Sequence, residues 1–295
     1  MQGTSKIRSV IATGLRRMAP VLTLAVIGMI TGCEEIMDVN FSGDATKNLV
    51  VEGVITTDTM PQKVILSYTG DYFKITDKNM AMGAEVSITD GENLFPLAEV
   101  SPGIYQTDSA VYGVAGKTYT LHVILPDGRE YEASDYLRPC GALDSIRQSP
   151  NYNTYISGYG YDVLLYAQEP QPAGDNYLYL LYLQDELYTD TITEVSFVND
   201  EFVNGNYVSD FAVYRIAEAD IASGPTTVTL EMHSVSKEYY AFLSALMVET
   251  VWRGSPWDGP PADLPGNVSN GATGFFRASD VKRKSRGFLP LPRVN

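Results

Sequence analysis

Short apolar or alternating runs of residues, each followed by a turn sequence, recur between residues 48 and 139. The run 84–89 alternates apolar and polar side chains with the period of a half-buried strand, and it stops at the turn pair Asp90-Gly91. Runs of the same kind lie at 49–56, 63–68, 94–100, 104–107, 118–125 and 130–133. About seven short strands at this spacing predict an antiparallel β-sandwich of immunoglobulin-like or prealbumin-like type over residues 48–139.

The pattern changes after residue 139, because Arg138-Pro139-Cys140-Gly141 interrupts it. Tyrosine is frequent between residues 152 and 188, where the run 177–183 is apolar enough for a buried strand. Further strands are predicted at 162–167, 210–216, 226–232 and 275–279. Residues 140–295 are therefore predicted to form a second, Tyr-rich β domain that ends in a basic tail.

One helix is predicted in this second domain, near residues 236–252. Large apolar residues recur there at steps of three and four, which is the period of an amphipathic helix. Ser234 or Ser236 is the expected N-cap, and Gly254 and Pro256 end the pattern. We expect the helix to pack on a sheet, and a helix that binds a partner is the alternative. The fold class predicted for the whole chain is mainly β.

In front of the first predicted strand, residues 18–33 form an apolar run that follows four basic residues and no acidic residue. This is the pattern of a secretory signal peptide, and the run of about 14 residues is shorter than the roughly 20 of a membrane-spanning helix. Its end, Ile30-Thr31-Gly32-Cys33, resembles a bacterial lipobox. We therefore expect residues 1–32 to be a cleaved signal peptide, Cys33 to carry lipid, and residues 33–47 to form a tether. An ordinary secreted protein or a retained anchor helix is the alternative.

The net charge of the chain limits the classes of partner that it can bind. The chain has 21 Lys and Arg against 36 Asp and Glu, a net charge of −15; without residues 1–32 the balance is 21 − 4 = 17 against 36, or −19. So acidic a body excludes nucleic-acid binding through phosphate neutralisation. It also repels anionic lipids, so we expect contact with the membrane through acyl chains on Cys33. The basic residues from Arg277 onward either pair with the protein's own carboxylates or stay solvated.

Groups that commonly carry catalysis are few in this sequence. If Cys33 carries lipid, Cys140 has no disulfide partner, and its neighbours predict an inert packing position rather than a reactive thiol. His122 and His233 fall in different predicted domains, and strand parity puts His122 on the wetter face of its strand. No zinc, phosphate-loop, dinucleotide or serine-hydrolase motif is recognisable. We predict no catalytic residue, metal or cofactor, while a calcium site or a carboxylate pair assembled from distant residues stays open.

Four aromatic residues are the candidates for contact with a ligand or a partner: Tyr159, Tyr161, Trp252 and Trp257. Tyr and Trp combine a flat apolar face with a polar edge, which suits sugars, peptides and protein surfaces. Packing within and on the sheets is the alternative role of these four side chains.

A set of short motifs resembles a known family in order and spacing. They are Cys33-Glu-Glu-Ile36, Leu49-Val-Val-Glu-Gly53, Pro102-Gly-x-Tyr-Gln-Thr107, Gly116-x-x-Tyr-x-Leu121, Asp144-Ser-Ile146 and Gly266-Asn-Val-Ser-Asn-Gly271. Together they are similar to the Bacteroidota outer-membrane lipoproteins of domain of unknown function 4249 (DUF4249), over nearly the whole chain after residue 32. The resemblance implies an outer-membrane lipoprotein, often encoded beside a TonB-dependent outer-membrane receptor, and it implies no catalytic residues. The basic tail after Arg277 departs from the family's pattern.

These features favour a non-enzymatic, lipid-anchored envelope lipoprotein of the outer membrane. The acidic residues Glu34, Glu35 and Asp38 after the lipobox also resemble a surface-export signal, which favours exposure at the cell surface. With the family resemblance, the expected role is an accessory or ligand-binding subunit associated with a TonB-dependent receptor. The alternatives are a structural or adhesive surface lipoprotein and a polymer-degrading enzyme.

Overall fold

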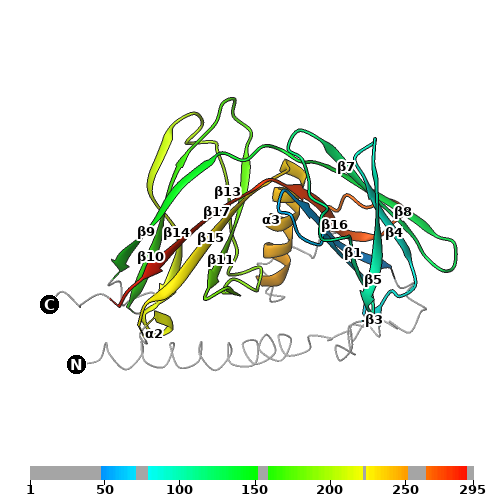
Figure 1. The fold of residues 1–295 in the computed structure, drawn as a ribbon, viewed down its shortest axis with the longest axis horizontal. Helices are drawn as coiled ribbons and strands as arrows, with labels where there is room; N and C mark the ends of the chain where they lie inside the picture. The colour runs from blue at the N-terminus through cyan, green and yellow to red at the C-terminus, as the bar shows by residue number, and fades with distance from the viewer. Residues whose placement is uncertain (1–47, 71–78, 152–158, 222–223, 252–263, 291–295) are drawn as a thin grey trace, which may run out of the picture. The chain divides into compact units, whose positions relative to one another are not determined.

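The computed structural model describes residues 48–70, 79–151, 159–221, 224–251 and 264–290 (Figure 1). The expected signal peptide, the lipidation site Cys33 and the tether lie outside these residues, as do Trp252 and Trp257. The described chain is mainly β, as the sequence predicts, and it contains one large mixed sheet, two smaller antiparallel sheets and two short helices.

The first sheet is built from most of the strands predicted in the N-terminal part and from one strand near the C-terminus. Its order is β16 (Thr273–Ser279), β1 (Leu49–Thr56), β2 (Lys63–Tyr68), β6 (Ile104–Gln106), β5 (Leu94–Ser101), β4 (Glu85–Thr89), β7 (Thr118–Ile124) and β8 (Glu130–Tyr136), and β3 (Asn79–Met80) also pairs with β2. β16 runs parallel to β1, and all other neighbours in this sheet are antiparallel. Each run predicted as a strand between residues 48 and 139 forms one.

This sheet is continuous and nearly closed. β5 pairs with β6 on one side and with β4 on the other, with a register shift between Glu99 and Ser101. The sheet stays open between its edge strands, β8 and β16. There the side-chain amide of Asn267 donates to the carbonyl oxygens of Ser134 and Phe276 (3.1 and 2.7 Å) and accepts from the Phe276 N–H (2.9 Å). Ser134 belongs to β8 and Phe276 to β16, so one side chain connects the two edge strands. The enclosed core includes Leu66, Ile88, Tyr119 and Phe276.

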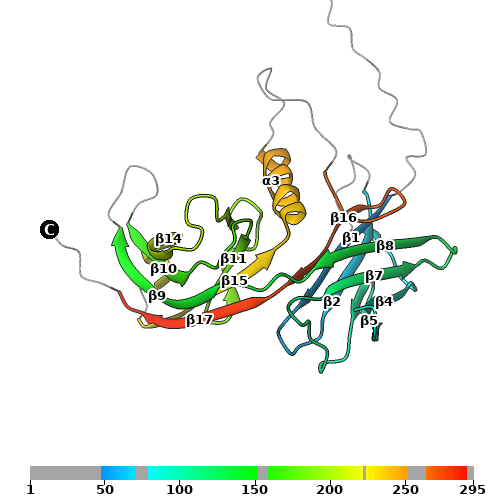
Figure 2. The same cartoon turned by 90° about the horizontal axis from the view of Figure 1, so that it is seen from above.

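The two smaller sheets face each other across a second core. One has the order β14 (Tyr207–Ala217), β10 (Gly160–Gln168) and β9 (Ala142–Asn151). The other has the order β12 (Glu186–Leu187), β11 (Asn176–Leu183), β15 (Thr226–Val235) and β17 (Val281–Phe288), and β13 (Ser196–Asn199) pairs with β11. Figure 2 shows β16 and β17, orange to red, passing from the first sheet to the smaller sheets.

The helix α3 (Lys237–Val251) confirms the helix predicted from the apolar period, and Ser236 is its N-cap, because the Ser236 Oγ accepts from the Tyr239 N–H at 3.3 Å. Its aromatic residues contact both parts of the fold. The ring centroids of Tyr239 and Phe242 lie 5.0 and 5.6 Å from that of Phe275 of β16, and the ring centroid of Tyr240 lies 5.4 Å from that of Phe197 of β13. The other helix, α2 (Glu218–Ile221), is too short for its period to show in the sequence. Neither helix in the described part of the chain has the length and apolar character to cross a membrane.

Asp280 holds the junction between the first sheet and the smaller sheets. Its carboxylate accepts from the Thr57 hydroxyl and from the Cys140 N–H, both at 2.9 Å, while its own N–H donates to Ser234 at 3.0 Å. Cys140 is half-buried here, and burial raises the pKa of its thiol. These surroundings agree with an inert packing position rather than a reactive thiol.

Candidate functional site

Two of the four aromatic candidates lie in the described residues, and their surroundings differ. Tyr159, just before β10, is 40% exposed, whereas Tyr161 is 3% exposed and packs in the core between the smaller sheets. For Tyr161 the packing role that the sequence left open is therefore the one observed. The histidines lie as expected: His122 is on the solvent side of β7, near Glu132 (3.7 Å), and His233 is buried in β15.

A group of three buried carboxyl groups forms where three strands end or begin. Glu169 follows β10, Asp175 precedes β11 and Asp200 follows β13. Because Asn176 of β11 pairs with Asn199 of β13, the residues next to this pair, Asp175 and Asp200, meet, and the Asp200 N–H donates to the Asp175 carbonyl at 3.1 Å. The register of two antiparallel strands thus places two of the three acids side by side.

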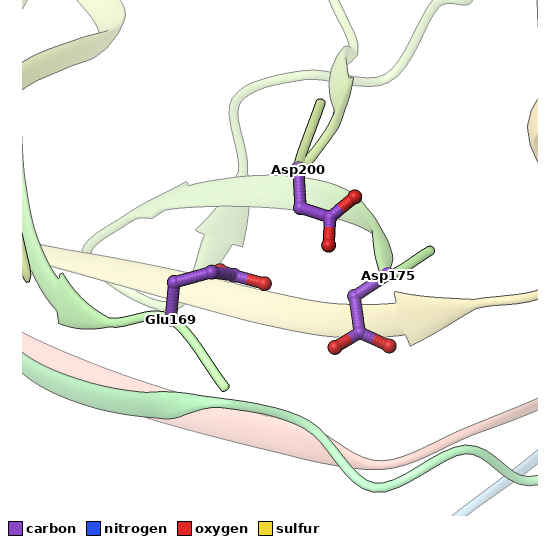
Figure 3. Close-up of side chains that lie close together, drawn as sticks. All are labelled: Glu169, Asp175 and Asp200. Atoms are coloured by element: carbon purple, nitrogen blue, oxygen red, sulfur yellow. The ribbon is translucent and has the colours of Figure 1, made fainter. Parts of the chain in front are cut away.

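Glu169 joins this pair through the turn between β10 and β11. Its N–H donates to the Asn206 carbonyl (3.1 Å), and the Gly205 N–H donates to the carbonyl of the next residue, Pro170 (3.1 Å), so the turn is attached to the loop 200–206 that follows β13. One carboxylate oxygen from each acid lies within 4.8 Å of the others. Figure 3 shows the three carboxyl groups turned toward one another. We call Glu169, Asp175 and Asp200 the acidic cluster.

Each carboxylate of the acidic cluster has a contact within the protein. Glu169 accepts from the Tyr177 hydroxyl at 2.9 Å, and both oxygens of Asp200 accept from the Gly174 N–H at 3.0 and 2.9 Å. Asp175 forms an ion pair with Arg138, with 3.6 Å between Nη1 and Oδ1. These contacts compensate only part of the cost of burying three acids together.

Because these contacts offset burial only in part, the pKa values of Glu169 and Asp175 are raised. Burial raises the pKa of Glu169 to about 7; the Tyr177 hydrogen bond acts against this rise, and the charges of Asp175 and Asp200 add to it. Burial also raises the pKa of Asp175, although Arg138 acts against this rise. Near neutral pH Glu169 is therefore poised between its protonated and its ionised form.

The acidic cluster is the set of described residues best placed to hold a metal ion. Its donors are all oxygen atoms, which suit a hard cation such as Ca²⁺ or Mg²⁺. However, Ca²⁺ takes six to eight oxygen ligands, so the three carboxylates would have to use both of their oxygens, or be joined by backbone carbonyls or water, to complete a calcium site.

Beside the acidic cluster lies a cavity of about 360 Å³, bounded by strands of both smaller sheets, by the loop 200–206 and by α3. Six aromatic rings form much of its wall, and we call it the aromatic cavity: Tyr177, Tyr179, Phe197, Phe202, Phe211 and Tyr240. Among the described residues that line it, Glu169, which is 6% exposed, is the one acidic residue, and none is basic. Phe202 is 88% exposed, so an apolar ring stands in solvent beside an apolar cavity.

Two other hollows are larger but less suited to retain a small molecule. One of about 540 Å³ lies over β7 and β8, with His122, Glu130 and Glu132 in its wall. The other, of about 610 Å³, includes Asp162 and Glu194. Both have a more polar and more open lining than the aromatic cavity, whereas small-molecule sites are mainly apolar with a few polar groups.

Sequence reasoning did not identify the aromatic cavity or the acidic cluster. Tyr177 and Tyr179 lie in a run that the sequence marks as unusually rich in tyrosine, but the acids carry no such signal. Glu169, Asp175 and Asp200 are spread over three turns of an acidic chain, and they meet through the pairing of β11 with β13 and the contacts of the Glu169 turn with the loop 200–206.

Comparison with known proteins identifies one family. The family model described as Domain of unknown function (DUF4249) matches residues 34–285. The match ends within β17, so it includes Lys282, Arg283 and Lys284 of the basic tail, whereas Arg286 and Arg293 lie beyond it. No curated protein matches the chain.

Proposed function

This chain belongs to the DUF4249 family, and we propose that it is a non-enzymatic, lipid-anchored lipoprotein of the outer membrane that binds a small ligand. In this proposal it acts as an accessory subunit of a TonB-dependent outer-membrane receptor. The observation that carries the ligand-binding role is the aromatic cavity, which has an apolar wall and one buried carboxyl group. This combination is characteristic of small-molecule sites.

Attachment to the membrane is proposed from the sequence. The basic start, the short apolar run and the Ile30-Thr31-Gly32-Cys33 ending support cleavage before Cys33 and lipid on its thiol. An acidic body gains nothing from anionic headgroups, so the acyl chains have to supply the affinity. The acids Glu34 and Glu35 support exposure at the cell surface.

Within this proposal the two parts of the fold have different tasks. The first sheet serves as a scaffold, and its continuous core and the connection of its edges by Asn267 support this task. The immunoglobulin-like or prealbumin-like type proposed for it comes from the spacing of its strands in the sequence. The smaller sheets, the loop 200–206 and α3 form the part that contacts ligand or receptor. The proposed contact residue Tyr159 lies just before β10 of this second part, while Trp252 and Trp257 remain contact candidates from the sequence alone.

Co-purification tests the proposal. A tagged chromosomal copy, extracted from outer membranes in mild detergent, is expected to bring down a TonB-dependent receptor. Cys33→Ser is expected to move the protein from the membrane fraction to the soluble fraction, whereas the matched variant Cys140→Ser keeps it in the membrane. Repeated isolation as a free monomer contradicts the accessory role. If deletion of the gene changes surface attachment but not nutrient uptake, the structural or adhesive function replaces it.

A further inference from the structure

The wall of the aromatic cavity indicates the chemistry of its ligand. Six aromatic side chains line the same space, and the face of an aromatic ring is apolar and carries partial negative charge. Gln168 and Asn199 add amide groups, and of the lining residues that the structure describes, Glu169 is the one that can carry charge near neutral pH. A ligand that fits such a wall has an apolar body.

The carboxyl group of Glu169 determines which polar group of a ligand fits next to it in the cavity. Its carboxyl accepts one hydrogen bond from Tyr177 at 2.9 Å, and a carboxylate can accept several. Asp175 and Asp200 lie behind it, and the nearby Arg138 is paired with Asp175 rather than with Glu169. This end of the cavity therefore combines negative charge with free capacity to accept hydrogen bonds.

We propose that the aromatic cavity binds an organic ammonium compound, a primary amine on an apolar body, with the ammonium group on Glu169 and the body among the aromatic rings. An ammonium group supplies hydrogen-bond donors to Glu169 and a positive charge that no described residue of the lining has, and aromatic faces attract cations. The inference rests on the proposed ligand-binding function and adds the chemical class of the ligand. It depends on neither the lipid anchor nor the receptor.

Three probes share the same apolar body and differ in the charge of their terminal group: 4-phenylbutylamine, 4-phenyl-1-butanol and 4-phenylbutyrate. They therefore show the effect of charge on affinity at nearly constant ligand size. Calorimetry on the full-length protein in lipid nanodiscs at pH 8 measures their affinities. We expect the amine to bind ten- to a hundred-fold more tightly than the alcohol, which is the usual gain from a hydrogen bond to a charged group. The carboxylate probe is expected to bind most weakly, because Glu169 repels it.

Glu169→Gln tests the assignment of the ammonium to one residue. The amide keeps the size of the side chain but loses its charge, so the amine should bind no better than the alcohol, while the affinity for the alcohol stays unchanged. The matched control is Glu201→Gln, which removes an exposed acid of the loop 200–206 that does not line the cavity. It should leave all three affinities unchanged. Thermal unfolding of both variants confirms that they are folded.

The outcomes separate this inference from the proposed function. Equal affinities of the wild-type protein for amine and alcohol contradict the ammonium ligand but retain an apolar binding site. An affinity for the amine that survives Glu169→Gln contradicts the assignment of Glu169. If none of the probes binds, both the inference and the ligand-binding function are wrong. Loss of the receptor in co-purification changes none of these results.

Discussion

Glu169 lies where the acidic cluster meets the aromatic cavity, and its ionisation affects the stability of the fold as well as the proposed binding of an amine. Burial raises its pKa from an ordinary value of 4.5 to about 7, with Asp175 and Asp200 adding to the rise. The folded protein therefore keeps this carboxyl protonated over a pH range in which the unfolded chain ionises it. Ionisation of Glu169 favours unfolding as the pH rises from about 4.5 to about 7.

Glu169→Gln should remove this pH-dependent cost. A pKa that rises from 4.5 to about 7 corresponds to about 3 kcal/mol, so the variant is expected to be more stable than the wild-type protein by up to that amount at pH 8. At pH 4 the two proteins should be equally stable, because Glu169 is protonated in both states of the wild-type chain. Urea unfolding at the two pH values measures the difference. A variant that is less stable than the wild-type protein at pH 8 contradicts the assigned pKa.

Phe202 allows a second prediction about a single residue. Because its side chain is 88% exposed, Phe202→Ala should change the free energy of unfolding by less than about 0.5 kcal/mol. Because the ring also lines the aromatic cavity, the affinity for 4-phenylbutylamine should fall several-fold. Denaturant unfolding and calorimetry of one preparation test both parts. Unchanged binding would show that the ring belongs only to the loop surface.

Among the elements, β17 shows that a basic segment can hide a strand. Half of its residues are basic and most are exposed, which left a solvated tail and pairing with the protein's own carboxylates as alternatives, and the segment forms an edge strand on β15. Charged residues are common on edge strands because they discourage further pairing. Arg283 also reaches inward: its guanidinium hydrogen-bonds to Glu231 on β15 and to Asp58 near β1. Pairing with the protein's own carboxylates, one of the two alternatives, is thus observed.

The contact between Arg283 and Glu231 predicts a large cost of mutation. Burial alone would raise the pKa of Glu231, but the hydrogen bonds from His233 and Arg283 lower it to about 2. Arg283→Ala removes both guanidinium hydrogen bonds from this buried carboxylate, so we expect a loss of about 3 kcal/mol. Lys284→Ala, on the same strand and exposed, should cost less than about 0.5 kcal/mol. Urea unfolding at pH 7 measures both, and equal effects of the two variants would contradict the pairing.

The other elements show which patterns a sequence can reveal. The runs 49–56 and 84–89 and the helix α3 show clear periods, and the structure has them where they are predicted. β9 was not predicted, because its residues Asp144, Ser145 and Arg147–Asn151 break the alternation and include a proline. Its neighbour β10 determines that it is a strand. Local periodicity thus identifies strands that bury one face, but not strands that are held by their partners.

At the scale of the whole molecule, strand partners decide the architecture. β16 was predicted as a strand, but its sequence gives no sign that it runs parallel to β1, more than 200 positions away in the chain. After β8 the chain forms the two smaller sheets and comes back to the first sheet only with β16. The order of elements along the sequence does not show this return. For the same reason the acidic cluster and the aromatic cavity could not be predicted, since both depend on the pairing of β11 with β13.

Asn267 connects the two edges of the first sheet and provides a prediction for the whole molecule. Asn267→Ala leaves the buried Phe276 N–H without its acceptor and removes the donor for two carbonyl groups. The expected loss of stability is about 2 kcal/mol. Thr120→Ala, which removes an exposed hydroxyl contact with Ser134 on the same sheet, should cost less than about 0.5 kcal/mol. If thermal unfolding shows the same small loss of stability for both variants, the connection between β8 and β16 does not depend on Asn267.

The central claim is that lipid on Cys33 holds this acidic, β-rich body at the outer membrane. Intact-mass spectrometry of the protein extracted from membranes tests it most directly. The account predicts a chain that begins at Cys33 and carries the additional mass of acyl groups on that residue. A chain that retains residues 1–32, or one that begins at an unmodified Cys33, would contradict it.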